Sequence, residues 1–284
     1  MESVSTLDVS AVVCTKNSIS GIEQSLQSLH QAEVGQIIVV DANSTDGTAD
    51  IARALADLVL TDTGKGLGNA RNIGIARSTG AYVLNMGSDN VLPPGELEKM
   101  IGYLTNGNFQ GVSAQTRVLG DSYVARGLNV WRSGKFPSGP RPVIGTPTLF
   151  VGDLLRTHPY DSTRRFSDDS ELCERWAAEF GAHFAISDAV CFEVGKVSWK
   201  EVKIRATMYG ESDHEVFTHG RESQGWGLTR SLRSVLHPVK SDFIEPLTSD
   251  QTVVEKVNAI PFLTLFTSLR YLGWVQQMWA KNGD

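Results

Sequence analysis

The sequence predicts an α/β fold of the doubly wound, Rossmann-like kind, with a mostly parallel sheet flanked by helices. Three observations predict this class. Short apolar runs rich in β-branched residues alternate with segments of helical periodicity over about the first 105 residues. The runs are apolar throughout, which is typical of strands that are buried on both faces. They also end on polar residues, at the edge where open α/β sheets bind ligands.

The individual elements follow from these patterns. Buried strands are predicted over residues 9–14, 36–40, 57–60 and 82–86. Helices are predicted over residues 22–29, 49–58 and 69–78, and another begins at Pro94, where proline and acidic residues suit a first helical turn. Ser44, Thr45 and Asp46 precede the second of these helices, and any of the three can cap it.

The regular alternation of strand and helix patterns changes after Gly107. We predict, in order, a strand over 111–119, a helix over 122–131, a strand over 149–151, a helix over 167–180, an edge strand over 184–192 and a helix over 197–209. Residues 133–147 are rich in Pro and Gly and predict a long mobile loop that carries Lys135 and Arg141. This loop either orders over phosphates, with Arg132 nearby, or is a solvated basic loop.

The composition narrows the class of protein. The chain has 284 residues, a hydrophobic content of 41% and a net charge of −6. This is globular composition, so a disordered chain and a coiled coil are excluded. The acidic balance argues against a nucleic-acid partner that is bound through a global basic field. Cys14, Cys173 and Cys191 are odd in number and widely spaced, which favours neither a disulfide framework nor a zinc site.

The same features predict a cytoplasmic location. Free cysteines suit a reducing compartment, and the N-terminal stretch MESVSTLDVSAVV lacks the pattern of a signal peptide. We expect no membrane-spanning helix, since Arg270 interrupts the most apolar stretch, residues 260–279. For that stretch three interpretations stay open: packing as core, a homo-oligomer interface, or peripheral contact with the inner face of the membrane.

Polar residues follow the predicted strands at one edge of the sheet. Thr15 and Asn17 follow the first strand, Asp41 the second, and Asp89 the strand over 82–86. Any single one could be a turn or cap residue, but several at one sheet edge indicate a binding site. The glycines near residue 66 do not have the spacing of G-x-G-x-x-G, and no strand leads into a P-loop. A dehydrogenase or a P-loop enzyme is therefore disfavoured.

Four segments carry a resemblance to a known family: VSAVVCTKN, IIVVDANSTDGT, GLGNARNIGIARSTGAYVLNMGSDNVLPPGELEKM and RRFSDDSELCERW. In this order and spacing they resemble the family 2 glycosyltransferases of the GT-A fold, over about residues 8–176. The resemblance implies inverting transfer of a sugar from a nucleotide diphosphate sugar, with a UDP-sugar favoured, to a hydroxyl of a glycan or lipid-linked acceptor. It also implies a place in polysaccharide biosynthesis. A GT-A domain over 1–230 would comprise a nucleotide-binding half at about 1–105 and an acceptor half at about 106–230, followed by a helical extension over 231–284.

The resemblance also implies roles for individual residues. The donor would contact Thr15, Asn17, Asp41, Lys65, Arg71, Ser88 and Asp89. Asp89 would be the last Asp of the metal-binding D-x-D motif, and Asp169 would be the general base with Asp168 beside it. The metal would be Mn²⁺ or Mg²⁺, which neutralises the leaving diphosphate, while a carboxylate takes the proton of the acceptor hydroxyl.

The chain departs from the family pattern at three positions. Gly87 replaces the first Asp of D-x-D, Cys14 replaces a frequent Pro, and Glu193 stands where many members place a metal-binding His. Glu193 is either a hard oxygen ligand or a surface charge on an edge strand. Asp168 and Glu171 also have the spacing of a capping box, and capping is compatible with catalysis by Asp169, because a helix N-terminus favours an ionised carboxylate.

Two other functions stay open at this point. The missing first Asp suggests a non-catalytic protein that binds sugar nucleotides. A sugar nucleotidyltransferase would use a similar sheet and metal, although no glycine-rich basic signature follows the first strand.

Overall fold

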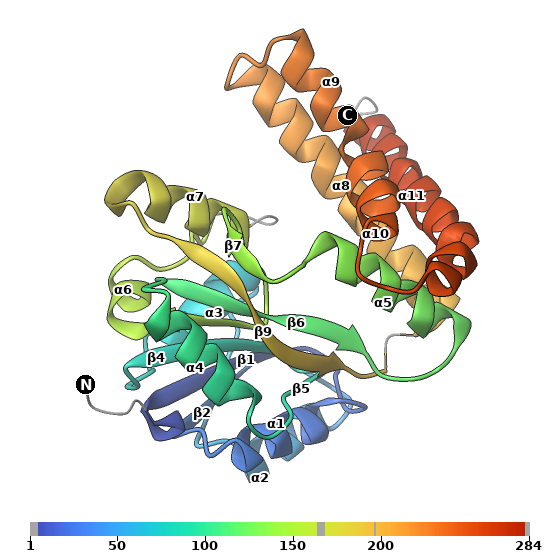
Figure 1. The fold of residues 1–284 in the computed structure, drawn as a ribbon. Helices are drawn as coiled ribbons and strands as arrows, with labels where there is room; N and C mark the ends of the chain where they lie inside the picture. Colours follow the sequence, from blue (N-terminus) through green and yellow to red (C-terminus); the bar gives the residue numbers. More distant parts are fainter. Residues whose placement is uncertain (1–4, 164–167, 196, 282–284) are drawn as a thin grey trace. The chain divides into compact units, whose positions relative to one another are not determined.

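The computed structural model describes residues 5–163, 168–195 and 197–281 (Figure 1). They form two compact units. The sheet unit comprises residues 1–117 and 138–195, and the helical unit comprises residues 118–137 and 196–284. This division differs from the predicted boundary after residue 230, which falls inside a helix that spans Leu228–Val239.

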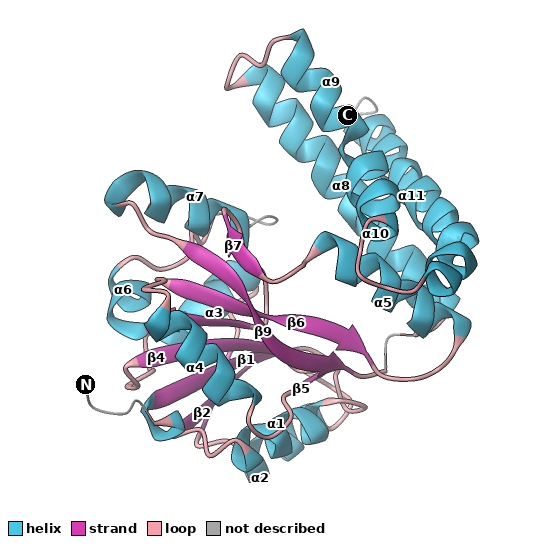
Figure 2. Ribbon diagram, in the orientation of Figure 1, coloured by secondary structure: helices cyan, strands magenta, loops and turns pink. Residues whose placement is uncertain are grey.

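The sheet unit is built on one mixed sheet with helices on both faces, which confirms the predicted α/β class (Figure 2). Its strands are β1 (Val9–Thr15), β2 (Gln36–Asp41), β3 (Leu58–Thr61), β4 (Tyr82–Gly87), β5 (Asn90–Val91), β6 (Gly111–Val118), β7 (Gly139–Arg141), β8 (Thr148–Val151) and β9 (Phe184–Glu193). They lie in the order β3-β2-β1-β4-β8-β6-β9-β5, with β7 paired to β9. Strands β3, β2, β1 and β4 are parallel, while β8 pairs antiparallel with β4 and β6.

The helices of the sheet unit cover the two faces separately. They are α1 (Ile22–Gln31), α2 (Thr48–Leu55), α3 (Leu67–Ile75), α4 (Glu96–Asn106), α6 (Gly152–Thr157) and α7 (Asp168–Phe180), and a short 3₁₀ turn spans Thr6–Asp8. Val13 of β1 packs in a core with Leu26 of α1 and Met100 of α4, whereas its neighbour Val12 packs in a second core with Trp176 of α7. Both faces of the strand are therefore buried, which explains the uninterrupted apolar run in the sequence.

A close approach of α3 to β1 brings one candidate residue to the sheet. A Cβ atom at Gly74 would lie 2.5 Å from Val12 Cγ1, so only glycine allows this contact. Arg71 lies three residues before Gly74 and is 6% exposed. It is therefore held, one helical turn away, toward the carboxyl ends of the strands.

The described part of the helical unit is built from helices (Figure 2). They are α5 (Tyr123–Lys135), α8 (Trp199–Glu222), α9 (Leu228–Val239), a π-helical segment (Lys240–Ile244), α10 (Glu245–Leu247) and α11 (Val253–Lys281). Trp131 of α5 packs at 4.9 Å, ring centre to ring centre, against Phe266 of α11. Phe262 and Phe266 are buried, so one face of residues 260–279 packs as core, whereas Leu272 and Trp279 are exposed.

The predicted mobile loop over 133–147 is shorter than expected, because α5 continues to Lys135 and β7 begins at Gly139. Lys135 is 16% exposed and its ammonium lies 3.1 Å from Asp242 Oδ1. The interpretation of Lys135 as a solvated residue or a phosphate ligand on a loop is therefore wrong. Similarly, the helix predicted over 197–209 extends to Glu222, and β9 lies between β6 and β5 and is not an edge strand.

A buried charge cluster joins the helices of the helical unit. The fully buried carboxylate of Asp242 accepts hydrogen bonds from Arg270 (2.6 Å), Lys135 (3.1 Å) and the indole of Trp131 (3.0 Å). Arg270 also donates to both oxygens of Asp213, at 2.6 and 2.8 Å. Two cations and two carboxylates thus balance each other away from water, and removing one partner would leave an uncompensated buried charge.

None of the helices within the described ranges combines the length and the apolar character that crossing a bilayer requires.

We expect Asp242→Asn to lower the free energy of unfolding by about 3 kcal/mol near neutral pH, because it leaves Arg270 and Lys135 short of a counter-charge. Urea unfolding followed by circular dichroism measures this change. The exposed Asp250 provides a matched control, and Asp250→Asn should have little effect. Equal stability of the two variants would contradict the importance of the cluster.

The cost of Asp242→Asn should also shrink in acid. Burial alone would raise the pKa of Asp242, but Lys135 and Arg270 outweigh it and hold the pKa below its ordinary value. The stabilisation is thus present above the ordinary carboxyl pKa and is lost as pH falls through the lowered pKa of the folded state. A gap between wild type and variant that stays constant down to that pH would contradict this assignment.

Candidate active site

The loops after β1 and β2 are tied together at the carboxyl edge of the sheet. Thr15 and Asp41 are directly paired in the parallel register. The carboxylate of Asp41 accepts hydrogen bonds from the amide and the hydroxyl of Ser44, at 2.9 and 2.6 Å. The backbone amide of Asn17 donates to Ser44 Oγ at 2.8 Å, and its side-chain Oδ1 accepts from the backbone amide of Thr45 at 2.9 Å. The structure therefore brings Thr15, Asn17 and Asp41 together, as the strand order predicted.

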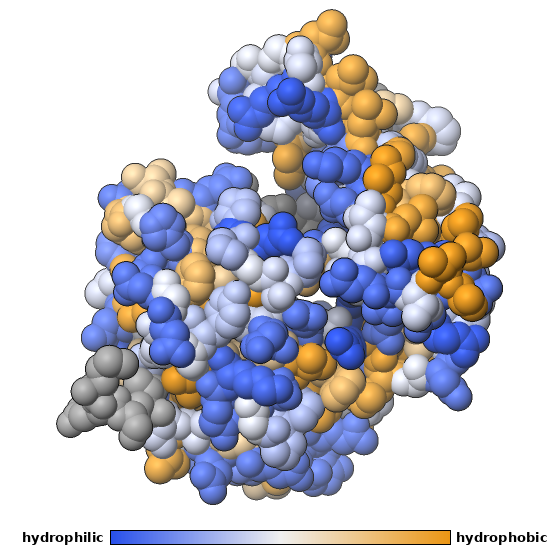
Figure 3. Space-filling view, viewed as in Figure 1, coloured by the Kyte–Doolittle hydropathy of each residue, from blue (hydrophilic) through white to orange (hydrophobic). Residues whose placement is uncertain are grey.

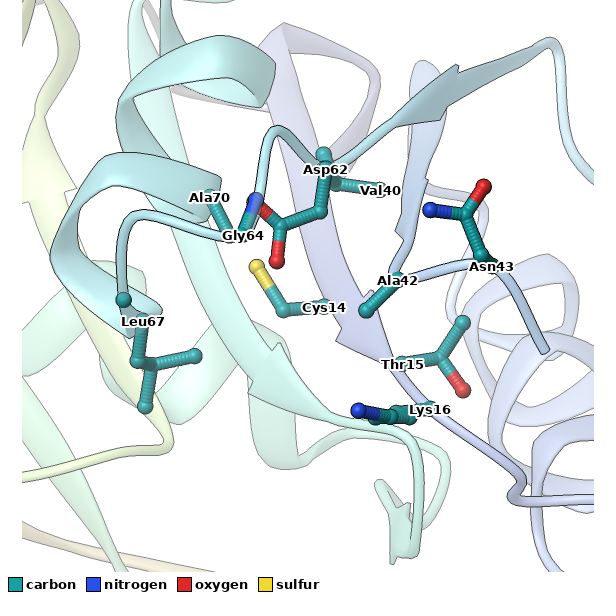
Figure 4. Close-up of a pocket in the computed structure, with 11 residues that line it drawn as sticks. Cys14, Thr15, Lys16, Val40, Ala42, Asn43, Asp62, Gly64, Leu67 and Ala70 are labelled. Carbon is teal, nitrogen blue, oxygen red and sulfur yellow. The ribbon is translucent and has the colours of Figure 1, made fainter.

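A cavity of 490 Å³ opens beside these loops (Figure 4). Its volume lies in the usual range of small-molecule sites, roughly 300–1,000 Å³. Polar and glycine residues on its wall include Thr15, Lys16, Asn43, Asp62, Gly64 and Gly66. Lys65 is exposed on the glycine loop that forms part of this wall. Lys16, Asn43 and Asp62 are additions to the sequence-based candidates. Asp62 comes directly after β3, much as Asp41 ends β2.

Cys14 and Asp62 face each other inside this cavity (Figure 4). Burial raises the pKa of the Cys14 thiol to about 12, against the opposing effect of Arg71. The thiol is therefore neutral at physiological pH and contributes an apolar surface rather than a nucleophile. Asp62 Oδ1 accepts from the amide of Gly64 at 2.9 Å, which shapes the glycine loop at the start of α3.

The segment after β4 holds Asp89 between two other elements. The hydroxyl of Ser88 donates to Ser18 Oγ at 2.9 Å, and the amide of Val194 donates to the Asp89 carbonyl at 2.8 Å. Asn90 of β5 lies directly opposite Glu193 of β9. Asp89 and Glu193 therefore lie on adjacent stretches of backbone. Glu193 is only 7% exposed, so its interpretation as a surface charge is wrong.

The side chain of Asn90 explains how the chain accommodates Gly87 in place of an aspartate. Asn90 Oδ1 accepts from the amide of Gly87 at 3.0 Å. A Cβ atom at Gly87 would lie 2.8 Å from both Asn90 Oδ1 and Asp89 Oδ1. The space that a side chain at position 87 would need is thus already taken by the side chains of Asp89 and Asn90.

The residues present fit a divalent cation only if a ligand contributes oxygens. Among the described residues, His, Cys, Asp and Glu form no group of three or more that could hold a metal ion by itself. Asp89 and Glu193 offer hard carboxylate oxygens. Mg²⁺ and Mn²⁺ are commonly bound by one or two carboxylates together with substrate phosphates, so this donor set is sufficient in the presence of a diphosphate.

Arg71 connects α3 to the start of α7. Its guanidinium donates to Asp168 Oδ2 at 2.7 Å, to Asp169 Oδ1 at 2.9 Å and to Thr146 Oγ1 at 2.6 Å. The resemblance placed Arg71 beside the nucleotide, but its contacts in this structure are with the carboxylates. Asp168 and Asp169 lie in the first turn of α7, as expected. Glu171, the second half of the predicted capping box, instead accepts from Arg175 at 2.7 Å.

Tyr160 holds Asp169 from the other side. Its hydroxyl donates to Asp169 Oδ1 at 3.2 Å and accepts from Asn85 Nδ2 at 3.1 Å. Its ring lies under the Arg71 guanidinium, with 5.1 Å between the Cζ atom and the ring centre. Sequence reasoning missed Tyr160, Asn85 and Thr146. An apolar strand that contains the single polar residue Asn85 was the only available signal.

Asp169 thus lies at the same end of β4 as Asp89. Asn85, which reaches Asp169 through Tyr160, is two residues before Gly87 at the carboxyl end of β4. In the antiparallel register Asn85 pairs with Thr148, so Thr146 lies across from that same end. Asp89 and Asp169, to which the resemblance assigned metal binding and catalysis, therefore lie toward the same end of β4.

The protonation of Asp169 reflects two opposing influences. Burial raises the pKa of Asp169, and the charge of Asp168 adds to the effect, while Arg71 and the Tyr160 hydroxyl oppose it. The net direction is upward. A raised pKa makes a carboxylate a stronger base than an exposed one. Burial also keeps the pKa of Tyr160 well above its usual value, so the phenol remains a hydrogen-bond donor.

Comparisons with known proteins identify the family of this chain. Residues 10–167 match the family model described as glycosyl transferase family 2. Because this match covers more than half of the chain, the protein belongs to glycosyltransferase family 2. Among curated relatives, the putative glycosyltransferase EpsE of Bacillus subtilis is 26% identical over 163 residues, which cover 54% of this chain and 56% of that protein. The succinoglycan biosynthesis protein ExoO of Rhizobium meliloti is 33% identical over 100 residues, or 33% of this chain and 29% of that one.

Solved structures share the fold. The mannosyltransferase PcManGT from Pyrobaculum calidifontis, in complex with GDP-Man and Mn²⁺, is 18% identical and has a TM-score of 0.64 over 96% of this chain and 88% of its own. TarS of S. aureus in complex with UDP-GlcNAc is 15% identical, with a TM-score of 0.52 over 97% of this chain and 92% of its own. The fold is therefore GT-A-like.

We expect Tyr160→Phe to raise the pKa of Asp169 further, because the phenol hydrogen bond favours the ionised carboxylate. Nuclear magnetic resonance titration of the Asp169 side-chain carboxyl measures the change. Tyr82→Phe is a suitable control, since Tyr82 lies at the opposite end of β4. An unchanged or lowered pKa of Asp169 in the Tyr160→Phe protein would show that the hydrogen bond does not favour the carboxylate.

Proposed function

We propose that this protein is an inverting glycosyltransferase that moves a sugar from a nucleotide diphosphate sugar to a hydroxyl group, with Asp169 as the general base. The observation that carries the proposal is the placement of Asp169 and Asp89 toward the same end of β4, on a sheet whose carboxyl edge also carries a cavity of a size that can hold a nucleoside. Family membership supports the reaction class. The complexes of structural neighbours with GDP-Man and UDP-GlcNAc support a nucleotide-sugar donor, and a UDP-sugar remains the first choice.

The donor's nucleoside would occupy the cavity between the loops after β1, β2 and β3. Thr15, Asn17, Asp41 and Lys65 lie on or beside its wall, and Asp62 supplies a further hydrogen-bond acceptor. The diphosphate would then extend toward Ser88 and Asp89 at the end of β4. Asp89 and Glu193 would hold Mn²⁺ or Mg²⁺, and the cation would supply positive charge against the leaving diphosphate.

Asp169 would take the proton from the acceptor hydroxyl. A hydroxyl is a poor nucleophile near neutral pH, so a correctly placed base accelerates its attack. Arg71 and the Tyr160 hydroxyl both donate to Oδ1, and the backbone amide of Thr146 also donates to this carboxylate. The proton would be accepted at Oδ2, which neither Arg71 nor Tyr160 occupies. A single base on the acceptor side, without a second nucleophile, results in attack opposite the leaving group and hence in inversion. The relation to a succinoglycan biosynthesis protein supports a glycan or lipid-linked acceptor in polysaccharide biosynthesis.

We expect Asp169→Asn to reduce sugar transfer by about 10²–10⁴-fold while the dissociation constant of UDP stays within a factor of about two, because the amide keeps the shape but cannot take a proton. Release of nucleoside diphosphate measures turnover, and calorimetry measures binding. Asp50→Asn, at an aspartate whose side chain is 83% exposed, is the matched control. Full turnover by the Asp169→Asn protein would rule out Asp169 as the base.

We expect Gly87→Ala to weaken Mn²⁺-dependent binding of UDP by about tenfold, because the new methyl group displaces the Asp89 carboxylate. Calorimetry with and without Mn²⁺ separates this effect from binding of the nucleobase and ribose, and the affinity measured without Mn²⁺ should change little. Gly102→Ala is the control, since a Cβ atom there has no neighbour within 4 Å. Equal loss of affinity with and without Mn²⁺ would point to a general disturbance of the pocket.

A further inference from the structure

Helix α9 turns its apolar side away from the protein. Leu228, Leu232 and Leu236 are spaced at intervals of four and form one stripe, and they are 82%, 56% and 51% exposed. The buried side of the helix carries Ser231 and Pro238, and Ser231 is 4% exposed. A surface helix of a water-soluble unit ordinarily has the reverse orientation, with its apolar stripe against the core. The exposed leucines therefore indicate a surface that becomes covered.

The charged side chains of α9 itself are all basic. Arg230 and Arg233 are exposed, and the stretch from Trp226 to Ser241 contains neither Asp nor Glu. Lys240 follows the helix and lies 3.8 Å from a carboxylate oxygen of Glu245. This basic stretch stands out in a chain whose net charge is −6. The Arg230 guanidinium also lies 4.5 Å from the centre of the Trp226 ring. Arginine and tryptophan are the residues that anchor proteins at the boundary between lipid head groups and acyl chains.

A neighbouring helix also exposes apolar side chains. The Tyr271 hydroxyl donates to the carbonyl of Val235 at 2.7 Å, so α11 lies beside α9. Leu272 and Trp279 of α11 are 42% and 68% exposed. In the space-filling view, hydrophobic side chains gather over α9 at the top of the view (Figure 3). Exposed apolar side chains of this unit are thus found on α11 as well as on α9.

We propose that α9 docks on the surface of a bilayer that contains anionic lipids, with the leucine stripe at the acyl boundary and the two arginines among the phosphates. A leucine face flanked by basic residues is the pattern of interfacial helices. With 12 residues, α9 is too short to cross the hydrocarbon layer, so it would lie in the plane of the surface. A second copy of the chain fits less well, because two α9 helices face to face would bring four arginines together without acidic partners on either helix.

The proposal that α9 docks on a membrane does not depend on which sugar donor the protein uses or on whether Asp169 is the general base. The sequence had left open a membrane contact through residues 260–279. One face of that stretch is core, so the proposed membrane contact is made mainly by α9. The inference concerns only the helical unit, and its test uses a binding readout that is separate from sugar transfer.

The experiment is flotation of the full-length protein with two kinds of vesicle, phosphatidylcholine alone and phosphatidylcholine mixed with phosphatidylglycerol. We expect binding to the mixed vesicles, weaker binding as salt is raised, and little binding to phosphatidylcholine alone. Leu232→Ser with Leu236→Ser should weaken binding on the order of a hundredfold, and Arg230→Glu with Arg233→Glu should abolish the preference for anionic vesicles.

A matched control is Ile204→Ser with Met208→Ser, an exposed apolar pair at the same spacing on α8. This variant should bind vesicles as the wild type does, and all variants should release UDP from the donor at the wild-type rate in the absence of lipid. Absence of vesicle binding by the wild type would overturn the proposal. So would equal loss in the α8 control, or a concentration-dependent dimer that the Leu232 and Leu236 changes dissociate without affecting flotation.

Discussion

The arrangement of the site depends on one buried cation, the guanidinium of Arg71. Burying an isolated charge is costly, and such groups persist in proteins only when opposite charges and hydrogen bonds satisfy them. Arg71 meets this condition through Asp168, Asp169 and Thr146. In sequence these residues are 75 to 98 positions away from it. The requirement to satisfy Arg71 therefore draws α7 and the segment before β8 to the end of β4, where Asp89 follows.

The same interaction sets the chemistry of Asp169. Without Arg71, burial beside Asp168 would leave the carboxylate protonated over a wide pH range. With Arg71 and the Tyr160 hydroxyl bound to one of its oxygens, the ionised form is available and its other oxygen is unencumbered by either group. The network thus reconciles two demands on a base, a raised pKa and the ability to ionise. On this account Arg71 and Tyr160 are positioning residues.

Much of the fold and part of the site could be predicted from the sequence, for identifiable reasons. Parallel strands in alternating order place Thr15 beside Asp41 because both end their strands at one edge, and chain order alone conveys this. Tyr160 and Asn85 could not be found in the same way, since their contact joins residues 75 positions apart and depends on packing. Gly87 signalled a departure from D-x-D, but the occupation of its side-chain space by Asp89 and Asn90 depends on the local turn geometry, which the sequence pattern did not reveal.

The helical unit was predicted less well. The Pro- and Gly-rich composition of residues 133–147 predicted a loop, yet Lys135 is the last residue of α5, and its charge is balanced by Asp242, more than 100 residues later. The sequence predicted only a helical extension over residues 231–284 and did not separate α9 within it. Periodicity also identifies an apolar face without indicating whether that face is buried. Local pattern therefore predicted element type in the sheet unit, whereas long-range contacts such as the Lys135–Asp242 pair could not be predicted in the helical unit.

The most direct test of the central claim is the anomeric configuration of the sugar at the moment it leaves the donor. Proton magnetic resonance of the first product formed, by transfer or by hydrolysis, reads this configuration before the ring equilibrates. A lone carboxylate base in the place of Asp169 predicts that an α-linked donor yields a β-configured product. A product of retained configuration would contradict the account. Retention would require either a protein nucleophile or attack on the face of the sugar from which the diphosphate leaves, and a single base in the place of Asp169 provides neither.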